Sequence, residues 1–430
     1  MTTTYDPHDP RYLDEGDLRD ELTRVYDLCH GCRLCWNLCP SFSTLFDLID
    51  ARDGDVAGLS HDEQDRVVDE CYQCKLCQLK CPYVPPHEWA LDFPRLMLRA
   101  AAAERAKSRI DVDGQLMGRT DLTGRVASAM AARTPLVNRV LTTPGTPIRR
   151  VMEKLGGLAA ERVLPPYAKQ RFSTWWKTRA ERRAAGANGR VALFPTCLVE
   201  YQSPGIGRDV VKVYEHNDIS IDVPAGTVCC GMPWLDSGDV EPFLEQGRRN
   251  VEVLARAVRA GRDVVVPQPT CGYVLKREYP DYLQSADARL VAEHTYDAAE
   301  YLVDVHRRGG LDTAFPGKVP ETVTWHAPCH LRAQNIGFRS RDLMALTGAQ
   351  VTVVDRCSGI DGTWGYRAEN YELARRVAQP LKQAIDDAGG DVVAGDCHLA
   401  NGAIFEETGR RPVHPVQVIA RAYGIPDEEE

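Results

Sequence analysis

Two stretches of this chain share one spelling: Cys29-His-Gly-Cys32-Arg-Leu-Cys35-Trp-Asn-Leu-Cys39-Pro40 and Cys71-Tyr-Gln-Cys74-Lys-Leu-Cys77-Gln-Leu-Lys-Cys81-Pro82. Both read C-x2-C-x2-C-x3-C-P, so three cysteines follow one another at short intervals and a fourth stands before a proline. Eight of the fifteen cysteines fall in these two copies. Thiols repeated at such close spacing are typical of a metal-binding segment.

The spelling predicts two 4Fe–4S clusters. In such runs three closely spaced thiolates bind one cluster, and the cysteine before proline binds the other cluster. Zinc is the alternative, but a zinc site takes four tetrahedral ligands, usually from two pairs of residues, and two successive triplets exceed that need. We therefore assign the eight thiols to two sets that cross between the copies: Cys29, Cys32, Cys35 and Cys81 in one, and Cys71, Cys74, Cys77 and Cys39 in the other.

The bulk properties narrow the class of protein. A length of 430 residues allows two to three domains. A hydrophobic content of 43% and a charged content of 26% are usual for a soluble globular protein. The net charge of −9, with no basic binding motif, gives no reason to expect a nucleic-acid partner. No secretory signal and no membrane-spanning apolar run is recognisable, so we expect a cytoplasmic protein with reduced cysteines.

Residues 1–100 are predicted to form a helical domain around the two copies. Apolar side chains recur at helical spacing over residues 18–28, just before the first copy. Ser60-His-Asp-Glu63 is the spelling of a helix capping box, and residues 93–107 are rich in good helix formers. Helices should therefore lead into and out of the two copies.

Residues 101–189 are predicted to be a connector that begins helical and breaks at two proline-containing turns, 143–147 and 164–166. Between residues 149 and 190 basic side chains outnumber acidic ones by eleven to three, and Trp175 and Trp176 lie in the middle. One interpretation is a solvated helix face with two tryptophans packed into a domain junction. The other is a docking strip for an acidic partner or a membrane surface, where each basic residue contributes about 1 kcal/mol.

Residues 190–310 and 311–430 are predicted to be two copies of one α/β unit. Short apolar runs have the pattern of buried parallel strands separated by helices: residues 191–194, 264–266, 351–354 and 392–393. Each remaining cysteine follows or ends a predicted strand, at the edge where open α/β sheets bind ligands. The first copy carries Cys197, Cys229, Cys230 and Cys271, and the second carries Cys329, Cys357 and Cys397.

The duplicated pattern C…CCG…CxxC resembles the cysteine-rich CCG domain of heterodisulfide reductase subunits. Joined behind a helical two-cluster ferredoxin domain, it is similar to the iron–sulfur subunits of anaerobic glycerol-3-phosphate dehydrogenase, of lactate and glycolate oxidases, and of D-type heterodisulfide reductase. The resemblance implies a helical ferredoxin domain followed by a duplicated α/β domain, α + α/β in class. It also implies electron transfer between a flavoprotein dehydrogenase and a quinone or a thiol/disulfide acceptor.

The chain departs from that family pattern at three positions. Val274 and Ala400 stand where CxxC would end in cysteine, and Ser358 replaces the second cysteine of CCG. The first copy keeps four thiols, enough for a further iron–sulfur cluster or a zinc ion, and should hold the better-formed centre. The second copy keeps three thiols, and four side chains are candidates to complete its site: Ser358, His330, His398 and Asp396.

Histidines accompany the thiols of the second copy. His330 and His398 directly follow cysteines, and His326 lies three residues before Cys329. Such histidines commonly orient metal ligands through hydrogen bonds. The alternative is a proton donor beside a redox centre, since histidine titrates near neutral pH. The candidate catalytic residues are Cys197, Cys229, Cys230, Cys271, His330 and His398.

Two nucleotide-binding spellings are absent from the sequence. No G-x-G-x-x-G follows a strand and no P-loop occurs, so no flavin or nicotinamide site of the usual type is expected. The expected function is an oxidoreductase subunit that needs a flavin-bearing partner to act on an organic substrate. It would lie in the cytoplasm or peripherally on the inner face of the cell membrane. The alternative is an electron-storing or scaffold subunit whose degenerate repeats only bind a partner.

Overall fold

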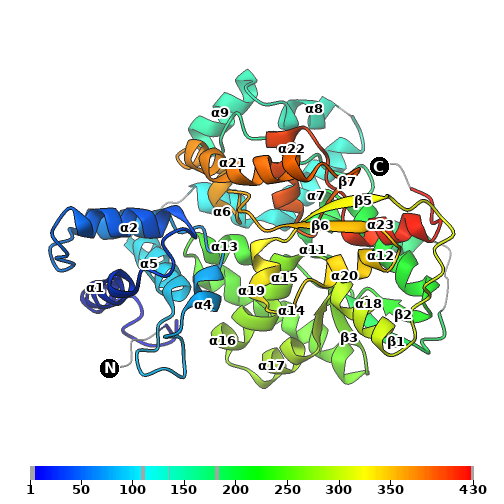
Figure 1. Ribbon diagram of the computed structural model, residues 1–430, viewed down its shortest axis with the longest axis horizontal. Helices are drawn as coiled ribbons and strands as arrows, with labels where there is room; N and C mark the ends of the chain where they lie inside the picture. The colour runs from blue at the N-terminus through cyan, green and yellow to red at the C-terminus, as the bar shows by residue number, and fades with distance from the viewer. Residues whose placement is uncertain (1–4, 108–111, 135, 180–183, 428–430) are drawn as a thin grey trace.

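The structure is a computed structural model that describes residues 5–107, 112–134, 136–179 and 184–427. A helical N-terminal domain lies at the left of Figure 1, and an α/β part with two parallel sheets lies at the right. The connector helices α8 (Leu136–Thr142) and α9 (Pro147–Gly156) stand at the top of that view, above α21 (Tyr371–Ala388) and α22 (His398–Thr408). The architecture is thus the α + α/β class that the sequence predicts.

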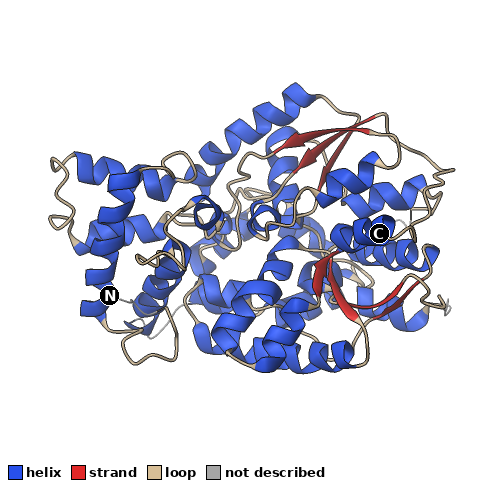
Figure 2. Ribbon diagram, turned by 60° about the horizontal axis from the view of Figure 1, so that its bottom comes forward, coloured by secondary structure: helices blue, strands red, loops and turns tan. Residues whose placement is uncertain are grey.

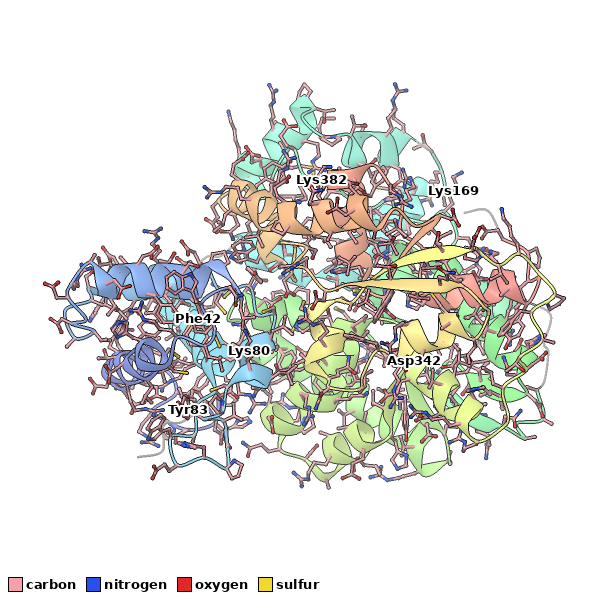
Figure 3. The ribbon with its side chains drawn as sticks, in the orientation of Figure 1. Phe42, Lys80, Tyr83, Lys169, Asp342 and Lys382 are labelled. Carbon is pink, nitrogen blue, oxygen red and sulfur yellow. The ribbon has the colours of Figure 1, made fainter. Side chains whose placement is uncertain are left out.

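Over residues 5–107 the N-terminal domain is built from five helices: α1 Glu15–Cys32, α2 Pro40–Asp50, α3 His61–Asp69, α4 Leu76–Lys80 and α5 Phe93–Lys107. Their apolar faces form one core, in which the ring of Phe42 stacks on Phe93 with centroids 4.5 Å apart. Ser60 and Glu63 form both hydrogen bonds of the expected capping box at the start of α3. Figure 3 shows this domain with its side chains, and labels Phe42, Lys80 and Tyr83.

The two cysteine copies share a backbone feature. The residue after the second cysteine adopts a left-handed conformation in each, with φ of 53° at Arg33 and 63° at Lys75. Arg33 caps the C-terminal end of α1, and Lys75 directly precedes the first residue of α4. Non-glycine residues seldom adopt this conformation, so the surroundings must hold it: Arg33 pairs with Asp50 and Lys75 with Glu278.

The described part of the connector contains five helices: α6 Val112–Gly118, α7 Thr120–Ala131, α8 Leu136–Thr142, α9 Pro147–Gly156 and α10 Phe172–Thr178. The expected break at residues 143–147 is present, because Thr146 caps α9 and Pro147 is its first residue. Trp175 and Trp176 are half-buried against the core of the first sheet. Arg179 lies over both rings and forms an ion pair with Glu215. The two tryptophans therefore belong to a packed junction.

All strands in the described part of the chain are parallel. They are β1 Gly189–Leu193, β2 Ile219–Asp222, β3 Asp263–Val266, β4 Thr295–Asp297, β5 Thr322–His326, β6 Gln350–Val354 and β7 Val392–Gly395. The first sheet has the order β2-β1-β3-β4, and the second has the order β6-β5-β7. A single bridge from Ala394 to Val413 stands where β4 stands in the first sheet. The internal repeat predicted from the sequence is therefore a structural duplication, and the two sheets are well separated in Figure 2.

The first half, from β1 to α18, contains α11 Thr196–Tyr201, α12 Pro204–His216, α13 Met232–Asp236, α14 Val240–Arg259, α15 Pro269–Tyr273, a π-helix over Val274–Glu278, α16 Tyr279–Leu283, α17 Ala286–Glu293 and α18 Ala298–Arg307. The second half, from β5 to α23, contains α19 Cys329–Ala333, α20 Arg339–Ala345, a 3-10 turn over Trp364–Tyr366, α21 Tyr371–Ala388, α22 His398–Thr408 and α23 Pro415–Ala422.

Helices of the two halves pack against each other. Helix α12 of the first half packs against α23 of the second, and α18 packs against α20. Val210, Leu302, Leu343 and Ile419 from these four helices share one buried core. Since burying such a side chain contributes about 1.5–3 kcal/mol, this core fixes the halves against each other. No helix in the described ranges is both long and apolar enough to span a bilayer.

Candidate metal and electron-transfer site

The carboxyl ends of the strands carry all seven thiols of the α/β part. Cys197, Cys229 with Cys230, and Cys271 follow β1, β2 and β3 respectively. In the second half Cys329, Cys357 and Cys397 follow β5, β6 and β7 in the same way. The sequence predicts this placement beyond the strand ends, and it is the usual ligand edge of an open α/β sheet.

The ferredoxin-type cysteines gather into two groups that cross between the copies. Burial raises the pKa of the Cys29 thiol, and the neighbouring Cys35, Cys81 and Cys32 raise it further. Burial also raises the pKa of Cys74, and the Cys39 thiol adds to that rise. A cavity is lined by Cys39, Cys71, Cys74 and Cys77 together. We call Cys29, Cys32, Cys35 and Cys81 the first thiol set, and Cys71, Cys74, Cys77 and Cys39 the second thiol set.

The second thiol set lies directly against the second half. The thiol of Cys357 donates a hydrogen bond to the Tyr72 hydroxyl at 3.3 Å, and the Tyr72 ring packs on Trp364 with centroids 5.1 Å apart. Cys39 and Cys329 border the same small apolar cluster. Tyr72 stands inside the second copy of the motif, so the motif itself supplies the contact between the domains.

The four thiols of the first half converge in a buried site. The Sγ atoms of Cys197 and Cys229 are 3.8 Å apart. Hydrogen bonds with the thiols of Cys197 and Cys230 hold the pKa of Cys229 well below its usual value, while Cys230 also hydrogen-bonds Cys271. Four buried thiols that converge in this way form a donor set suited to a metal ion or cluster, because thiolates are the ligand form.

An acid from the connector holds this site in place. The backbone N–H of Cys229 donates to Asp121 Oδ2 at 2.8 Å, and the Tyr201 hydroxyl donates to Asp121 Oδ1 at 3.0 Å. Asp121 lies in α7, far from the thiols in sequence. The sequence analysis did not predict this contact, because no residue pattern around Asp121 resembles a metal-ligand motif.

The backbone conformation explains why the CCG motif ends in glycine in both halves. Gly231 has φ of 88° and Gly359 has φ of 66°, values that L-residues rarely adopt. A Cβ at Gly231 would lie 2.9 Å from Phe243 Cδ2, and one at Gly359 would lie 2.1 Å from the Ala374 carbonyl oxygen. Glycine is therefore required in the second half even where Ser358 stands in place of the cysteine.

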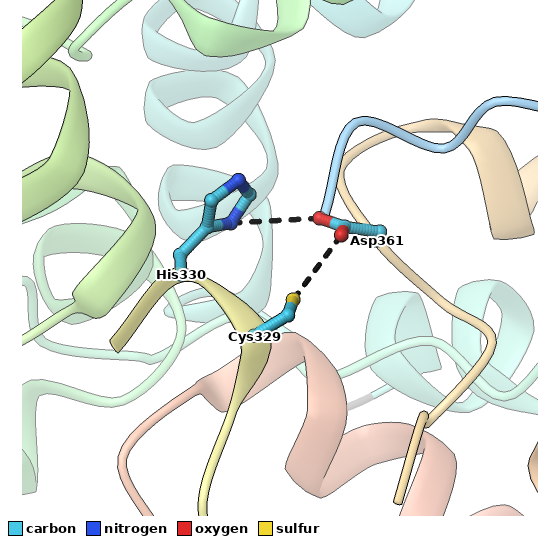
Figure 4. A group of neighbouring side chains, drawn as sticks. All are labelled: Cys329, His330 and Asp361. Carbon is cyan, nitrogen blue, oxygen red and sulfur yellow. Dashed lines mark hydrogen bonds and ion pairs between the residues drawn. The ribbon is translucent and has the colours of Figure 1, made fainter. Parts of the chain in front are cut away.

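The second half brings together Cys329, His330 and Asp361, shown in Figure 4. Cys329 Sγ donates to Asp361 Oδ2 at 3.2 Å, and His330 Nδ1 lies 3.6 Å from Asp361 Oδ1. The other ring nitrogen, His330 Nε2, is 3.1 Å from the backbone oxygen of Gln73 in the second copy of the motif. Asp361 thus joins the candidate ligands, although no spacing in the sequence identifies it.

The other side chains proposed for the second half are placed differently. Asp396 accepts hydrogen bonds from Trp325 Nε1 at 2.7 Å and from the Ser340 hydroxyl, so both its oxygens are engaged. His398 Nδ1 lies 3.3 Å from the Ser203 hydroxyl of the first half, and burial lowers its pKa to about 4. His326 Nε2 lies 3.0 Å from the Arg356 carbonyl oxygen. Cys397 Sγ accepts from Gln268 Nε2 at 3.3 Å.

A buried ion pair closes the junction between the ferredoxin-type domain and the first half. Lys75 Nζ lies 3.2 Å from Glu278 Oε1 and donates to Gln73 Oε1 at 2.7 Å. Burial lowers the pKa of Lys75, but the Glu278 carboxylate and other acidic neighbours outweigh it, and the net pKa is raised. Arg95 adds a second cation 3.9 Å from Glu278. The pair keeps the second thiol set and the π-helix after Cys271 in contact.

The residues present fit iron–sulfur ligation. The structure provides two crossed groups of four thiols in a helical domain, and no cysteine in the described ranges is in a disulfide. The comparisons with known families agree: residues 21–82 match the 4Fe-4S dicluster domain, and residues 191–276 and 323–400 match the CCG cysteine-rich domain. These features define an iron–sulfur protein of electron transfer.

The chain therefore joins a 4Fe-4S dicluster domain to a duplicated CCG cysteine-rich domain. It is 29% identical over 330 residues to one subunit of the anaerobic glycerol-3-phosphate dehydrogenase of Escherichia coli strain K12, covering 76% of this chain and 81% of that protein. Lactate utilization protein A of Bacillus cytotoxicus is 26% identical over 245 residues, which cover 54% of this chain and 98% of that protein. One subunit of the fumarate reductase (CoM/CoB) of Methanothermobacter marburgensis is 29% identical over 239 residues, which cover 54% of this chain and 44% of that protein.

Proposed function

We propose that this chain is the electron-transferring subunit of an oxidoreductase, which takes electrons from a flavoprotein dehydrogenase subunit and delivers them to a quinone or a thiol/disulfide acceptor. The observation that carries the proposal is the order in which groups of thiols adjoin one another through the molecule. The two thiol sets adjoin, since Cys35 of the first set helps to raise the pKa of Cys77 in the second, and the second set adjoins Cys329 and Cys357. Gln268 then links Cys397 to the wall of the first-half site.

Each proposed cofactor is assigned to named residues. The first and second thiol sets would each hold a 4Fe–4S cluster, and Cys197, Cys229, Cys230 and Cys271 would hold a further iron–sulfur cluster or zinc. Cys329, Cys357 and Cys397, with Asp361 or His330, would form a weaker site. Clusters, when bound, supply one-electron transfer; the protein's part is to bury the thiols and to order the sets. The partner is proposed because the similar proteins are named as dehydrogenase and reductase subunits.

The proposed location is the cytoplasm, with peripheral contact to the inner face of the membrane. The surface proposed to contact the membrane is not the basic strip around Trp175 and Trp176. Helices α7 and α9 expose large apolar side chains in rows: Leu122, Val126 and Met130 on the first, and Ile148, Val151 and Leu155 on the second. Exposed basic residues flank these rows: Arg125, Arg133, Arg139, Arg150 and Lys154. An amphipathic surface with a basic rim is suited to an anionic lipid leaflet.

The competing proposal is a scaffold or electron-storing subunit without an exit site. The favoured proposal predicts that the full chain, purified anaerobically and reduced with dithionite, is reoxidised by a quinone analogue or a small disulfide. Iron, sulfide and zinc analysis with electron paramagnetic resonance should show about eight irons in the two ferredoxin-type sets and further metal in the α/β part. A chain that holds its irons but is reoxidised by neither acceptor would support the scaffold instead.

A further inference from the structure

A cavity of about 740 Å³ lies between the connector and the thiols of the first half. Connector side chains form its outer wall: Leu122, Val126, Ala127, Met130, Val137 and Leu141. Leu122, Val126 and Met130 are also about half exposed, at 56%, 51% and 48%. The entrance of the cavity is therefore apolar and open to the outside.

The inner end of the cavity is lined by groups suited to redox chemistry. All four first-half thiols line it: Cys197, Cys229, Cys230 and Cys271. Asp236 lines it as well, and its Oδ1 is buried with no hydrogen-bond partner among the described residues. Burial and the Asp361 carboxylate raise the pKa of Asp236 to about 7. A carboxyl group that is partly protonated at neutral pH can donate a hydrogen bond to a carbonyl oxygen.

The apolar cavity differs from a second, adjoining cavity in the charge of its lining residues. No lysine, arginine or histidine is among the described residues that line the apolar cavity. A second cavity of about 920 Å³, at the second-half thiols, is lined by cations and anions, including Arg332, Arg356, His326 and Asp355. Thr270, Gly362 and Leu399 line both, so the two cavities adjoin. A hydrophilic, charged acceptor would suit the second cavity, and an uncharged lipophilic one the first.

We infer that the apolar cavity is the binding site for a lipid-soluble quinone, with its ring near the four first-half thiols and Asp236, and its apolar tail along α7 and α8. The inference rests on the proposed function, because it chooses between the two acceptor classes left open there. The volume is within the usual range for a small-molecule site and exceeds what a single quinone ring fills, so it leaves room for a tail.

Quinone reduction at this site consumes two electrons and two protons in total, because each quinone carbonyl becomes a hydroxyl. The two electrons would come from the reduced flavoprotein partner, which is oxidised by two electrons, and the clusters that the thiols would hold would supply one-electron transfer. The protons come from bulk water, and each forms one O–H bond of the quinol. Asp236 is proposed as a hydrogen-bond donor to the nearer carbonyl oxygen.

The test uses the full chain with its iron and a fluorescent probe, a heptyl hydroxyquinoline N-oxide, whose emission changes on binding. Ala127→Trp fills the cavity from α7, whereas Ala129→Trp places the same bulk on the exposed side of that helix, outside the lining. We expect Ala127→Trp to weaken probe binding about tenfold or more, a loss of about 1.4 kcal/mol, and Ala129→Trp to leave it within about twofold. Met152→Trp, from α9, is the second filling variant if Ala127→Trp loses its iron.

The outcomes distinguish this inference from the proposed function. If the parent and both filling variants bind the probe equally, the cavity is not the quinone site. The same conclusion follows if a quinone reoxidises the reduced filling variants at the parent rate. Failure of the proposed function would appear instead in the parent protein, as a reduced chain that neither quinone nor disulfide reoxidises. Reoxidation by a disulfide alone, with no probe bound by the parent, would refute the choice of quinone and favour the charged cavity.

Discussion

Replacing Lys75 with methionine should destabilise the junction between the ferredoxin-type domain and the first half. The side chains of Lys75 and Glu278 are only 1% and 2% exposed. Removing one member of a buried ion pair typically costs about 3–5 kcal/mol, because the other charge stays buried without its partner. Arg95, 3.9 Å from Glu278, retains part of the compensation, so we expect about 3 kcal/mol.

The assay is anaerobic urea unfolding followed by tryptophan fluorescence. At a slope of about 3 kcal/mol per molar urea, the midpoint of Lys75→Met should fall by about 1 M. Lys382→Met is the control, because Lys382 and Asp386 form an exposed i,i+4 pair that is worth about 0.3–0.5 kcal/mol. The double variant Lys75→Met with Glu278→Leu should recover most of the loss, since no buried charge is then left unpaired.

The pH dependence follows from the two pKa shifts. Burial raises the pKa of Glu278, but Lys75 and Arg95 lower it more, so its contribution to stability is present above about pH 4.3 and lost as pH falls below that. The raised pKa of Lys75 gives a contribution that is present below about pH 10.4 and lost above it. The parent pair is thus constant between about pH 5 and 10. In Lys75→Met the deficit should shrink as pH falls from about 8 to 5, because the unpaired Glu278 can take up a proton. A loss no larger than that of Lys382→Met at about pH 8 would refute this reasoning.

Three further changes have defined outcomes. Cys39→Ser should remove the paramagnetic signal of the second thiol set and spare that of the first, and loss of only the first would contradict the crossed ligation. Gly231→Ala should lower stability by about 1–2 kcal/mol, seen as a lower thermal midpoint, because alanine disfavours the left-handed φ of 88° at this position. The control is Gly402→Ala in α22, where an added Cβ would meet no atom within 4 Å and should cause no such loss. Equal thermal midpoints of the two variants would contradict the conformational explanation for Gly231. Arg150→Glu with Lys154→Glu should weaken sedimentation with anionic vesicles as much as added salt does, whereas unchanged sedimentation would exclude α9 as the lipid contact.

The local elements could be predicted because their signals are local. The capping box of Ser60 and Glu63, the break before α9 and the apolar strands β1, β3, β6 and β7 all follow from short-range spelling. Two strands, β2 and β4, escaped the sequence analysis because their sequences, ISID and TYD, contain no continuous apolar run. Their pairing depends on the neighbouring strands more than on their own residues.

The site was predictable only as far as its cysteines. Spacing identified the thiols, but Asp121 and Asp361 reach them through the fold, from α7 and from the loop after β6. No periodicity marks a carboxylate that will approach a cysteine from another element of the fold. The exposed apolar rows of α7 and α9 are similar: at helical spacing such residues usually form a core, and only the structure shows that they face outward.

The most direct test of the account is the rate at which reduced protein passes electrons to a quinone analogue, measured by stopped flow for Cys230→Ala and Cys357→Ala. The first half keeps four converging thiols, whereas the second keeps three beside Ser358. The account predicts that Cys230→Ala abolishes reoxidation while the paramagnetic signals of both ferredoxin-type sets persist, and that Cys357→Ala slows it less. Reoxidation of Cys230→Ala at the parent rate would contradict the exit site in the first half.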